Sequence, residues 1–231
     1  MNGALFDVLR SVDTPTVCNA IEAAQGKRGF NNFTKATMVA SAPEEKSFVG
    51  YALTAKISAT SAPEEAAERV KERRMAYYKY MAEGQRPSVA VIEDCDFPNC
   101  VGAFWGEINT TVHKGFGVSG VVTNGVVRDL GDLPTGFPVI AGSIGPSHAF
   151  VHVREFGKPV SVFGLEVEEG DLVHADRHGA LVIPSLVIPS LQHAIEKLIA
   201  TERLVLDPAS KPDFDFEAFA KAWAAFEAAR T

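Results

Sequence analysis

A short apolar run in the middle of the chain constrains the fold most. Residues 118–122 are rich in β-branched valine, and a run of this kind predicts a strand buried in a sheet. Asn124-Gly125 ends the run, because Asn-Gly is a strong turn signal. Arg128 and Asp129 come directly afterwards. The sequence therefore places a cation and a carboxylate side by side just beyond a core strand.

The Arg128-Asp129 pair has two interpretations. Loops beyond buried strands often carry ligand-binding groups. A guanidinium can hold a substrate carboxylate through two hydrogen bonds, and an aspartate oxygen suits a hard divalent cation. The alternative is a solvated turn pair, since exposed ion pairs are common and contribute little stability. The pattern around the pair favours the first interpretation.

An acidic residue lies upstream at a characteristic spacing. Glu107 and Arg128 are separated by residues 108–127, and this order of acid, twenty residues and Arg-Asp resembles the signature of the class II pyruvate aldolases of the RraA-like family. That family includes the 4-hydroxy-4-methyl-2-oxoglutarate/4-carboxy-4-hydroxy-2-oxoadipate aldolases. Other segments that resemble the family are 14–20, 49–54, 104–107 and 170–184. Two positions depart from it: Glu107 stands where the characterised aldolases have Asp, and Asn124 stands where many members have Asp.

The resemblance implies a fold and an assembly. Periodicity by itself predicts an α/β protein with short strands interleaved among helices. The family adds a swivelling β/β/α sandwich with short mixed strands and flanking helices. We expect a single domain over residues 1–231, with 208–231 as a C-terminal helical extension. The resemblance also implies a homo-oligomer, either a trimer or a dimer of trimers, with active sites between subunits.

The activity that the resemblance implies is that of a lyase. A divalent-metal-dependent aldolase and decarboxylase would form a pyruvate enolate from a 4-hydroxy-2-oxo acid or from oxaloacetate. Asp129 would hold Mg²⁺ or Mn²⁺, and Glu107 would reach the metal through water and relay a proton. Arg128 would orient the carboxylate of the small 2-oxo acid, and the amides of Ile108 and Asn109 would complete the anion site.

The sequence leaves open whether a further acid contributes to the site and whether the protein is an enzyme at all. The resemblance implies that an acid from the neighbouring subunit reaches the metal-bound waters, and Glu202 lies in the matching region. A solvated helix glutamate explains Glu202 equally well. Some relatives with this fold are protein-binding regulators that inhibit a ribonuclease without known catalysis, and a metal-free small-acid binding module is a third reading. The intact set of Glu107, Arg128 and Asp129 favours an enzyme, because a pure binder needs no metal-binding acid.

Composition excludes several partners. The net charge of -7 comes without a basic block, so we expect no nucleic-acid partner. No apolar run reaches 18 residues, which predicts no membrane span. Neither a Rossmann fingerprint nor a P-loop is present, so no nucleotide cofactor is indicated. The three cysteines are odd in number and are not spaced as a zinc site, which favours reduced thiols in the cytoplasm.

Several local patterns make separate predictions. Residues 103–114 predict a helix, and a start near Gly106 would leave amides free to bind a carboxylate. Ser61 and Glu64 predict a capping box at the start of another helix. Aromatic residues at helical spacing within 214–230 predict a packing face on the same subunit or on a neighbour. The tyrosine cluster Tyr77, Tyr78 and Tyr80 favours core or subunit packing over a ligand site.

Oxygen and imidazole side chains suggest further ligand sites, each with a structural alternative. Asp94, Asp96 and Asn99 follow a predicted strand, where they either ligate a cation or cap turns. The histidines of the C-terminal half have similar alternatives of metal ligation, substrate contact or turn and packing roles. They are His148, His152, His174 and His178.

Overall fold

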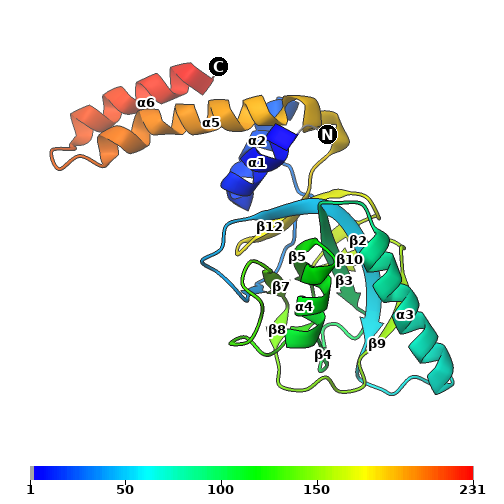
Figure 1. Ribbon diagram of the computed structural model, residues 1–231. Coiled ribbons are helices and arrows are strands. Elements are labelled where there is room, and N and C mark those ends of the chain that lie inside the picture. The colour runs from blue at the N-terminus through cyan, green and yellow to red at the C-terminus, as the bar shows by residue number, and fades with distance from the viewer. Residues whose placement is uncertain (1–2, 231) are drawn as a thin grey trace. The chain divides into compact units, whose positions relative to one another are not determined.

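The computed structural model describes residues 3–230 (Figure 1). The chain divides into two compact units. The first, called the sheet unit here, contains the chain up to Pro15 and residues 31–185. The second, called the helical unit, contains residues 16–30 and the chain from Leu186 onward. The prediction of one domain over the whole chain stays a prediction.

Helices and short strands are interleaved up to residue 115, and strands alone follow over residues 118–182. The helices are α1 (Gly3–Ser11), α2 (Thr14–Gln25), α3 (Ala67–Glu83), α4 (Glu107–Gly115), α5 (Ile188–Ala209), α6 (Phe216–Arg230) and the 3₁₀ turn η1 (Ser185–Val187). The strands are β1 (Val39–Ala40), β2 (Phe48–Ser58), β3 (Ser88–Asp94), β4 (Ala103–Trp105), β5 (Val118–Thr123), β6 (Val126–Val127), β7 (Val139–Ala141), β8 (Ser143–Ile144), β9 (His152–Phe156), β10 (Val160–Val162), β11 (Leu165–Val167), β12 (Leu172–Asp176) and β13 (Gly179–Val182).

A mixed sheet forms the centre of the sheet unit. Its strand order is β1-β7-β5-β3-β2-β12-β13, and β9 also pairs with β2. The pairs β2–β3, β3–β5 and β5–β7 are parallel, whereas β1, β9, β12 and β13 pair antiparallel with their neighbours. This mixture confirms the predicted α/β fold of short mixed strands with flanking helices.

The central strands are apolar throughout because both faces of the sheet are covered. In β3, Ala90 and Ile92 belong to a core cluster that also contains residues of α3 and β4. Val89 and Val91 point to the opposite face, into a cluster with the β10–β11 hairpin. Burial of each of these valine or isoleucine side chains stabilises the fold by roughly 1.5–3 kcal/mol. The sheet unit is therefore layered, with α3 and β4 on one face and β10–β11 on the other.

A second, smaller sheet carries the region of interest. Strands β4, β6 and β8 pair in parallel, with β6 between its two neighbours. The predicted helix over residues 103–114 is therefore partly wrong, since Ala103–Trp105 is a strand and α4 begins at Glu107. The first three residues are apolar and buried, and their backbone pairs with β6, a long-range contact that helical periodicity does not reveal.

The helical unit consists mainly of the end of the chain. Helix α6 runs back along α5 in Figure 1. Phe219 of α6 lies between two other aromatic rings, 6.1 Å from Phe216 and 5.6 Å from Trp223. The aromatic residues of the predicted packing face therefore contact one another in succession along α6. Among residues 3–230, no helix combines the length and apolar character that crossing a membrane requires.

One predicted helix start is wrong. Helix α3 begins at Ala67, and its N-cap residue, Ala66, makes no side-chain capping bond. Ser61 and Glu64 lie before the helix, so they form no capping box there.

Candidate functional site

The three-stranded sheet places the Arg128-Asp129 pair beside the start of α4. The Arg128 amide donates to the carbonyl of Trp105 across 2.9 Å, which continues the pairing of β6 with β4. Parallel strands have their carboxyl ends at the same edge of a sheet. The residues that follow β4, Gly106 and Glu107, therefore lie next to those that follow β6.

The Asp129 side chain caps the start of α4, although it comes from a different part of the chain. Its Oδ2 atom accepts a hydrogen bond from the Glu107 amide at 3.1 Å and lies 3.4 Å from Nε of Arg128. Asp129 has a φ of 57°, a left-handed conformation that aspartate tolerates better than most residues. The carboxylate thus performs the capping role that the N-cap residue, Gly106, cannot perform.

Gly106 leaves no space for a side chain. A Cβ atom at this position would lie 2.5 Å from Oδ2 of Asp129 and 2.9 Å from Nε of Arg128. Its backbone is extended, with φ at -147°, so any residue could adopt the conformation. A side chain at this position would have to displace both charged side chains from their observed places.

The first turn of α4 adds unpaired amides to the site. In a helix the first amides have no intrahelical partner, and they attract anions through the positive end of the helix dipole. The Thr110 amide already bonds to the Gly106 carbonyl at 3.0 Å, so the free positions are Ile108 and Asn109. Side chains of Arg128 and Asp129 are 31% and 36% exposed, which leaves them accessible. A guanidinium, a carboxylate and helix amides therefore converge where a small anion and a cation can bind together.

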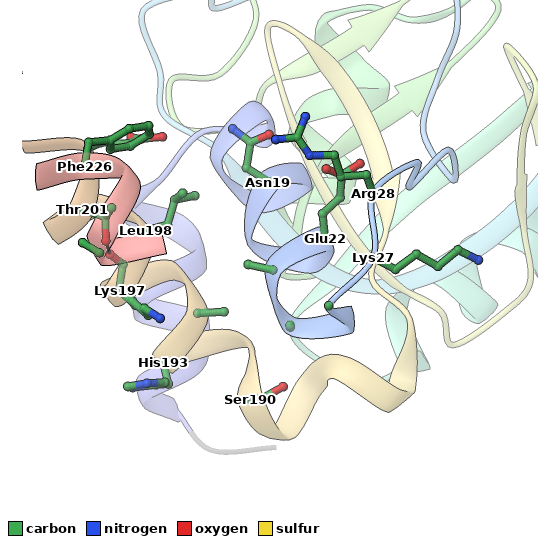
Figure 2. A pocket seen from close by; sticks show the side chains of 16 residues that line it. Asn19, Glu22, Lys27, Arg28, Ser190, His193, Lys197, Leu198, Thr201 and Phe226 are labelled. Carbon is green, nitrogen blue, oxygen red and sulfur yellow. Dashed lines mark hydrogen bonds between the residues drawn. The ribbon is translucent and has the colours of Figure 1, made fainter. Parts of the chain in front are cut away.

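Glu202, the remaining predicted site residue, belongs to the helical unit. It lies on α5 and lines a cavity of about 760 Å³ within that unit. Figure 2 shows Glu22 on α2 and Lys197 on α5 among the side chains that line the cavity. The predicted contribution of Glu202 to a neighbouring site stays a prediction.

The acidic loop after β3 has a structural explanation. Asp96 accepts hydrogen bonds from the Ala59 and Thr60 amides at 2.5 and 2.9 Å. Oδ1 of Asp94 accepts the Asp96 amide at 3.0 Å. These contacts match the turn-capping alternative. Among the described residues, no group of three or more His, Cys, Asp and Glu side chains is arranged to hold a metal ion.

His174 has structural partners on both ring nitrogens. Nε2 lies 2.9 Å from the Leu9 carbonyl, and Nδ1 lies 3.2 Å from the Thr14 hydroxyl. Burial lowers the pKa of His174. Nearby, Oδ2 of Asp176 accepts the Thr14 amide at 2.8 Å. The ring and the carboxylate thus fasten the start of α2 to β12.

The other three histidines also have contacts with nearby backbone or side chains. Nδ1 of His148 lies 2.7 Å from the carbonyl of Ala149, and Nδ1 of His152 lies 2.8 Å from that of Phe150. His178 contacts Oδ1 of Asp176 through its ring, at 3.1 Å. His152 begins strand β9, so His148 and His152 do not share a helix face.

The residues of α3 that hydrogen-bond to α4 were not predicted from the sequence. Tyr77 and Tyr78 of α3 reach two residues of α4, Asn109 and His113, through hydrogen bonds. A helical spacing of four between Asn109 and His113 was the available signal, since such residues share a face. Their partners on α3 could not be identified without the tertiary structure.

Comparisons with known proteins gave a family match and a curated relative. The family model described as RraA-like, Aldolase/RraA, matches residues 14–182. The chain is 30% identical over 124 residues to protein DlpA of Legionella pneumophila, a match that covers 52% of this chain. This chain spans only 19% of the length of that curated relative.

Solved structures share the fold at low sequence identity. A protein described among novel cellulases from microbes associated with the gut ecosystem superposes with a TM-score of 0.71 at 17% identity, covering 88% of this chain and 87% of that one. RraAS2 of Streptomyces coelicolor, described as an unusual member of the RNase ES inhibitor RraA protein family, gives 0.64 at 21% identity, with 91% and 98% covered. Identities this low show the fold alone.

Proposed function

This chain belongs to the RraA-like (Aldolase/RraA) family, and we propose that it is a divalent-metal-dependent lyase. The proposed reaction cleaves a carbon–carbon bond next to a 2-oxo acid. The substrate is a 4-hydroxy-2-oxo acid or oxaloacetate, and the common product is pyruvate.

One observation carries the proposal: Arg128, Asp129 and the first turn of α4 meet at a single point. The link is the hydrogen bond from the Glu107 amide to Asp129, reinforced by the narrow approach at Gly106. A solvated turn pair would need neither contact. A 2-oxo acid presents a carboxylate and a keto oxygen together, which suits a guanidinium and helix amides placed next to an oxygen ligand.

The donor set fits Mg²⁺ or Mn²⁺. Both observed contacts of the Asp129 carboxylate use Oδ2, which leaves Oδ1 for a cation, and hard cations prefer such oxygens with water in most remaining positions. In the proposal Asp129 would be the direct ligand, Glu107 would act through water, and Glu202 of a neighbouring copy would make a further contact. A bound divalent cation would supply positive charge that stabilises a developing enolate.

The protein's own groups have defined tasks in this reaction. Arg128 and the amides of Ile108 and Asn109 bind the substrate carboxylate and fix its plane. In oxaloacetate the bond to the departing carboxylate breaks, carbon dioxide leaves, and the electron pair remains as the pyruvate enolate. Glu107, which is exposed at the first position of α4, then relays a proton from water to the enolate carbon, which completes pyruvate.

Assembly into a homo-oligomer, a trimer or a dimer of trimers, is part of the proposal. Apolar side chains lie exposed in the segments that form the site: Ile108 is 75% exposed, Leu130 41% and Ile144 56%. Exposed apolar surface next to a charged site favours coverage by another molecule. A second copy would cover this surface and place its own acid near the cation.

Pyruvate release from oxaloacetate tests the proposal. The purified chain should release pyruvate with Mg²⁺ or Mn²⁺, lose activity in EDTA and regain it when metal is restored. Metal ions accelerate this decarboxylation without protein, so the Asp129→Ala variant at the same metal concentration is the control. Turnover that persists in EDTA would contradict the mechanism. A protein with no turnover under any metal would instead favour the non-catalytic regulator on the same fold.

A further inference from the structure

Asn109 is held in place by two hydrogen bonds through its side chain. Its Oδ1 accepts the Tyr78 hydroxyl at 2.6 Å, and its Nδ2 donates to the Phe104 carbonyl at 2.5 Å. One bond reaches α3 and the other reaches β4. The side-chain amide therefore connects the first turn of α4 to the two elements on which that helix rests.

The backbone of Asn109 is held as well. Its carbonyl lies 2.6 Å from Nδ1 of His113, and Nε2 of His113 lies 2.8 Å from the Tyr77 hydroxyl. The consistent arrangement has Nδ1 donating to the carbonyl and the tyrosine donating to Nε2. Burial raises the pKa of Tyr77 and lowers the pKa of His113 to about 4, so both groups stay neutral near pH 7 and keep these roles.

The surroundings exclude water from the inner part of this network, at Tyr77 and His113. Tyr77 and His113 are completely buried, and the His113 ring lies 4.7 Å from the Trp105 ring and 5.6 Å from the Tyr77 ring. Buried polar groups cost free energy unless they are paired, so a satisfied network fixes one geometry. Helix α4 has only 9 residues, and a helix this short depends on tertiary contacts for its position.

We propose that Tyr77, Tyr78, Asn109 and His113, called the α4 clamp, position the first turn of α4 so that its amides bind the substrate carboxylate. This inference rests on the proposed function, because it assigns the clamp to the same anion site. The clamp acts on Asn109 itself, whose own amide is one of the two free donors. These are positioning residues, and none of their side chains needs to touch the substrate.

A pair of matched tyrosine variants tests the clamp. Tyr78→Phe removes the hydroxyl that bonds to Asn109 and keeps the ring. Tyr80→Phe is the control: Tyr80 is on the same helix, is also half-buried, and its hydroxyl accepts the Thr54 amide of β2 at 3.1 Å. The measurements are KM and kcat for oxaloacetate, the Kd of oxalate with Mg²⁺ by calorimetry, and the melting temperature. Oxalate is a planar mimic of the pyruvate enolate.

The expected result separates positioning from stability. Tyr78→Phe should raise both KM and the Kd of oxalate roughly fivefold, the loss typical of one hydrogen bond, with kcat little changed. Tyr80→Phe should leave KM and the Kd of oxalate unchanged. Its melting temperature should fall by about as much as that of Tyr78→Phe, because each variant loses one hydrogen bond. If Tyr78→Phe does not fold, Asn109→Ala keeps the backbone amide and should show the same rise in KM and Kd.

Two results would overturn the inference, and they are distinguishable. A wild-type protein that binds oxalate and releases pyruvate, combined with equal constants for the Tyr78→Phe and Tyr80→Phe variants, overturns the clamp and leaves the proposed function intact. Equal constants for wild type and the Asn109→Ala variant would do the same. A wild-type protein that neither binds oxalate nor releases pyruvate overturns the proposed function, and the clamp's role with it.

Discussion

Asp129 combines two demands in one side chain. Its left-handed backbone and its bond to the Glu107 amide are structural, whereas its remaining oxygen is available to a cation. Asparagine meets the structural demands because it tolerates the same backbone region and offers an amide oxygen as a cap. It lacks the charge that a divalent cation needs. The two roles of this residue can therefore be separated by substitution.

The Asp129→Asn variant should fold like the wild type and lose metal-dependent activity. Asp129→Ala should also lose about 2 kcal/mol of unfolding free energy, because alanine is strained at this backbone conformation and caps no helix. Urea denaturation and metal titration of pyruvate release measure the two effects. Equal stability of both variants would mean that Asp129 has no capping role.

Arg128 should not tolerate lysine. Lysine keeps the charge but loses the planar fork that binds a carboxylate through two hydrogen bonds. We expect kcat/KM to fall on the order of 10²-fold, equivalent to about 2.7 kcal/mol of transition-state stabilisation. Steady-state kinetics with oxaloacetate measure this, and a near-native Arg128→Lys enzyme would make Arg128 a mere surface charge.

At the scale of elements, the site depends on how closely α4 approaches the end of β6. Gly106 permits this close approach, because a Cβ atom there would displace the side chains of Arg128 and Asp129. The other end of the helix has no such constraint: a Cβ atom on Gly115 would meet nothing within 4 Å. The two glycines of one short helix thus form a natural comparison.

Gly106→Ala should reduce kcat/KM on the order of 10²-fold, since displacements near 1 Å at a reacting centre have effects of this size. Gly115→Ala should leave activity unchanged. Kinetics and melting temperatures of both variants give the comparison. Similar activity in the two variants would show that the close approach at Gly106 has no functional consequence.

The packing of α4 also predicts how stability depends on pH. Burial lowers the pKa of His113 to about 4, below the value of about 6.5 expected in the unfolded chain. The unfolded state then binds more protons, so this contribution is complete above about pH 6.5 and decreases as the pH falls toward 4. The loss approaches about 1.4 kcal/mol per pH unit, and the lowered pKa of His174 acts in the same direction.

Urea denaturation of the wild type and of a His113→Gln variant between pH 7.5 and 5 measures this contribution. The variant should lose less stability on acidification, because glutamine does not titrate. Identical slopes for the wild type and the His113→Gln variant would contradict a neutral, buried His113.

At the scale of the whole molecule, the question is whether one chain makes a complete site. The sheet unit supplies Arg128, Asp129 and α4, whereas Glu202 belongs to the helical unit. The family match ends at residue 182, so most of the helical unit lies beyond it. Whether Glu202 acts on a neighbouring copy is therefore a question about the assembly.

Mixing two inactive variants answers it. Arg128→Ala and Glu202→Ala chains, exchanged together, should regain part of the activity if the site is shared, because some interfaces then carry neither substitution. Each variant alone is the control. If both groups act within one chain, every site stays defective and no activity returns. A monomer by light scattering would exclude the shared site.

The sequence by itself determined the buried strands, the turn after them and the Arg128-Asp129 pair. These features depend on local patterns: β-branched apolar runs, an Asn-Gly turn and a fixed spacing to Glu107. Such patterns act between residues close in the chain, or repeat across a family. They were therefore sufficient for the α/β fold, which the structure confirms.

Only the tertiary structure decided which groups touch. Residues 103–105 form a strand because β6 offers them a partner, and α3 starts at Ala67 without the expected capping box. The Asp129 cap on α4 joins residues 22 positions apart, and the Tyr78–Asn109 bond joins residues 31 positions apart. Contacts of this kind arise from the packing of elements, whose energy depends on neighbours that the local sequence does not specify.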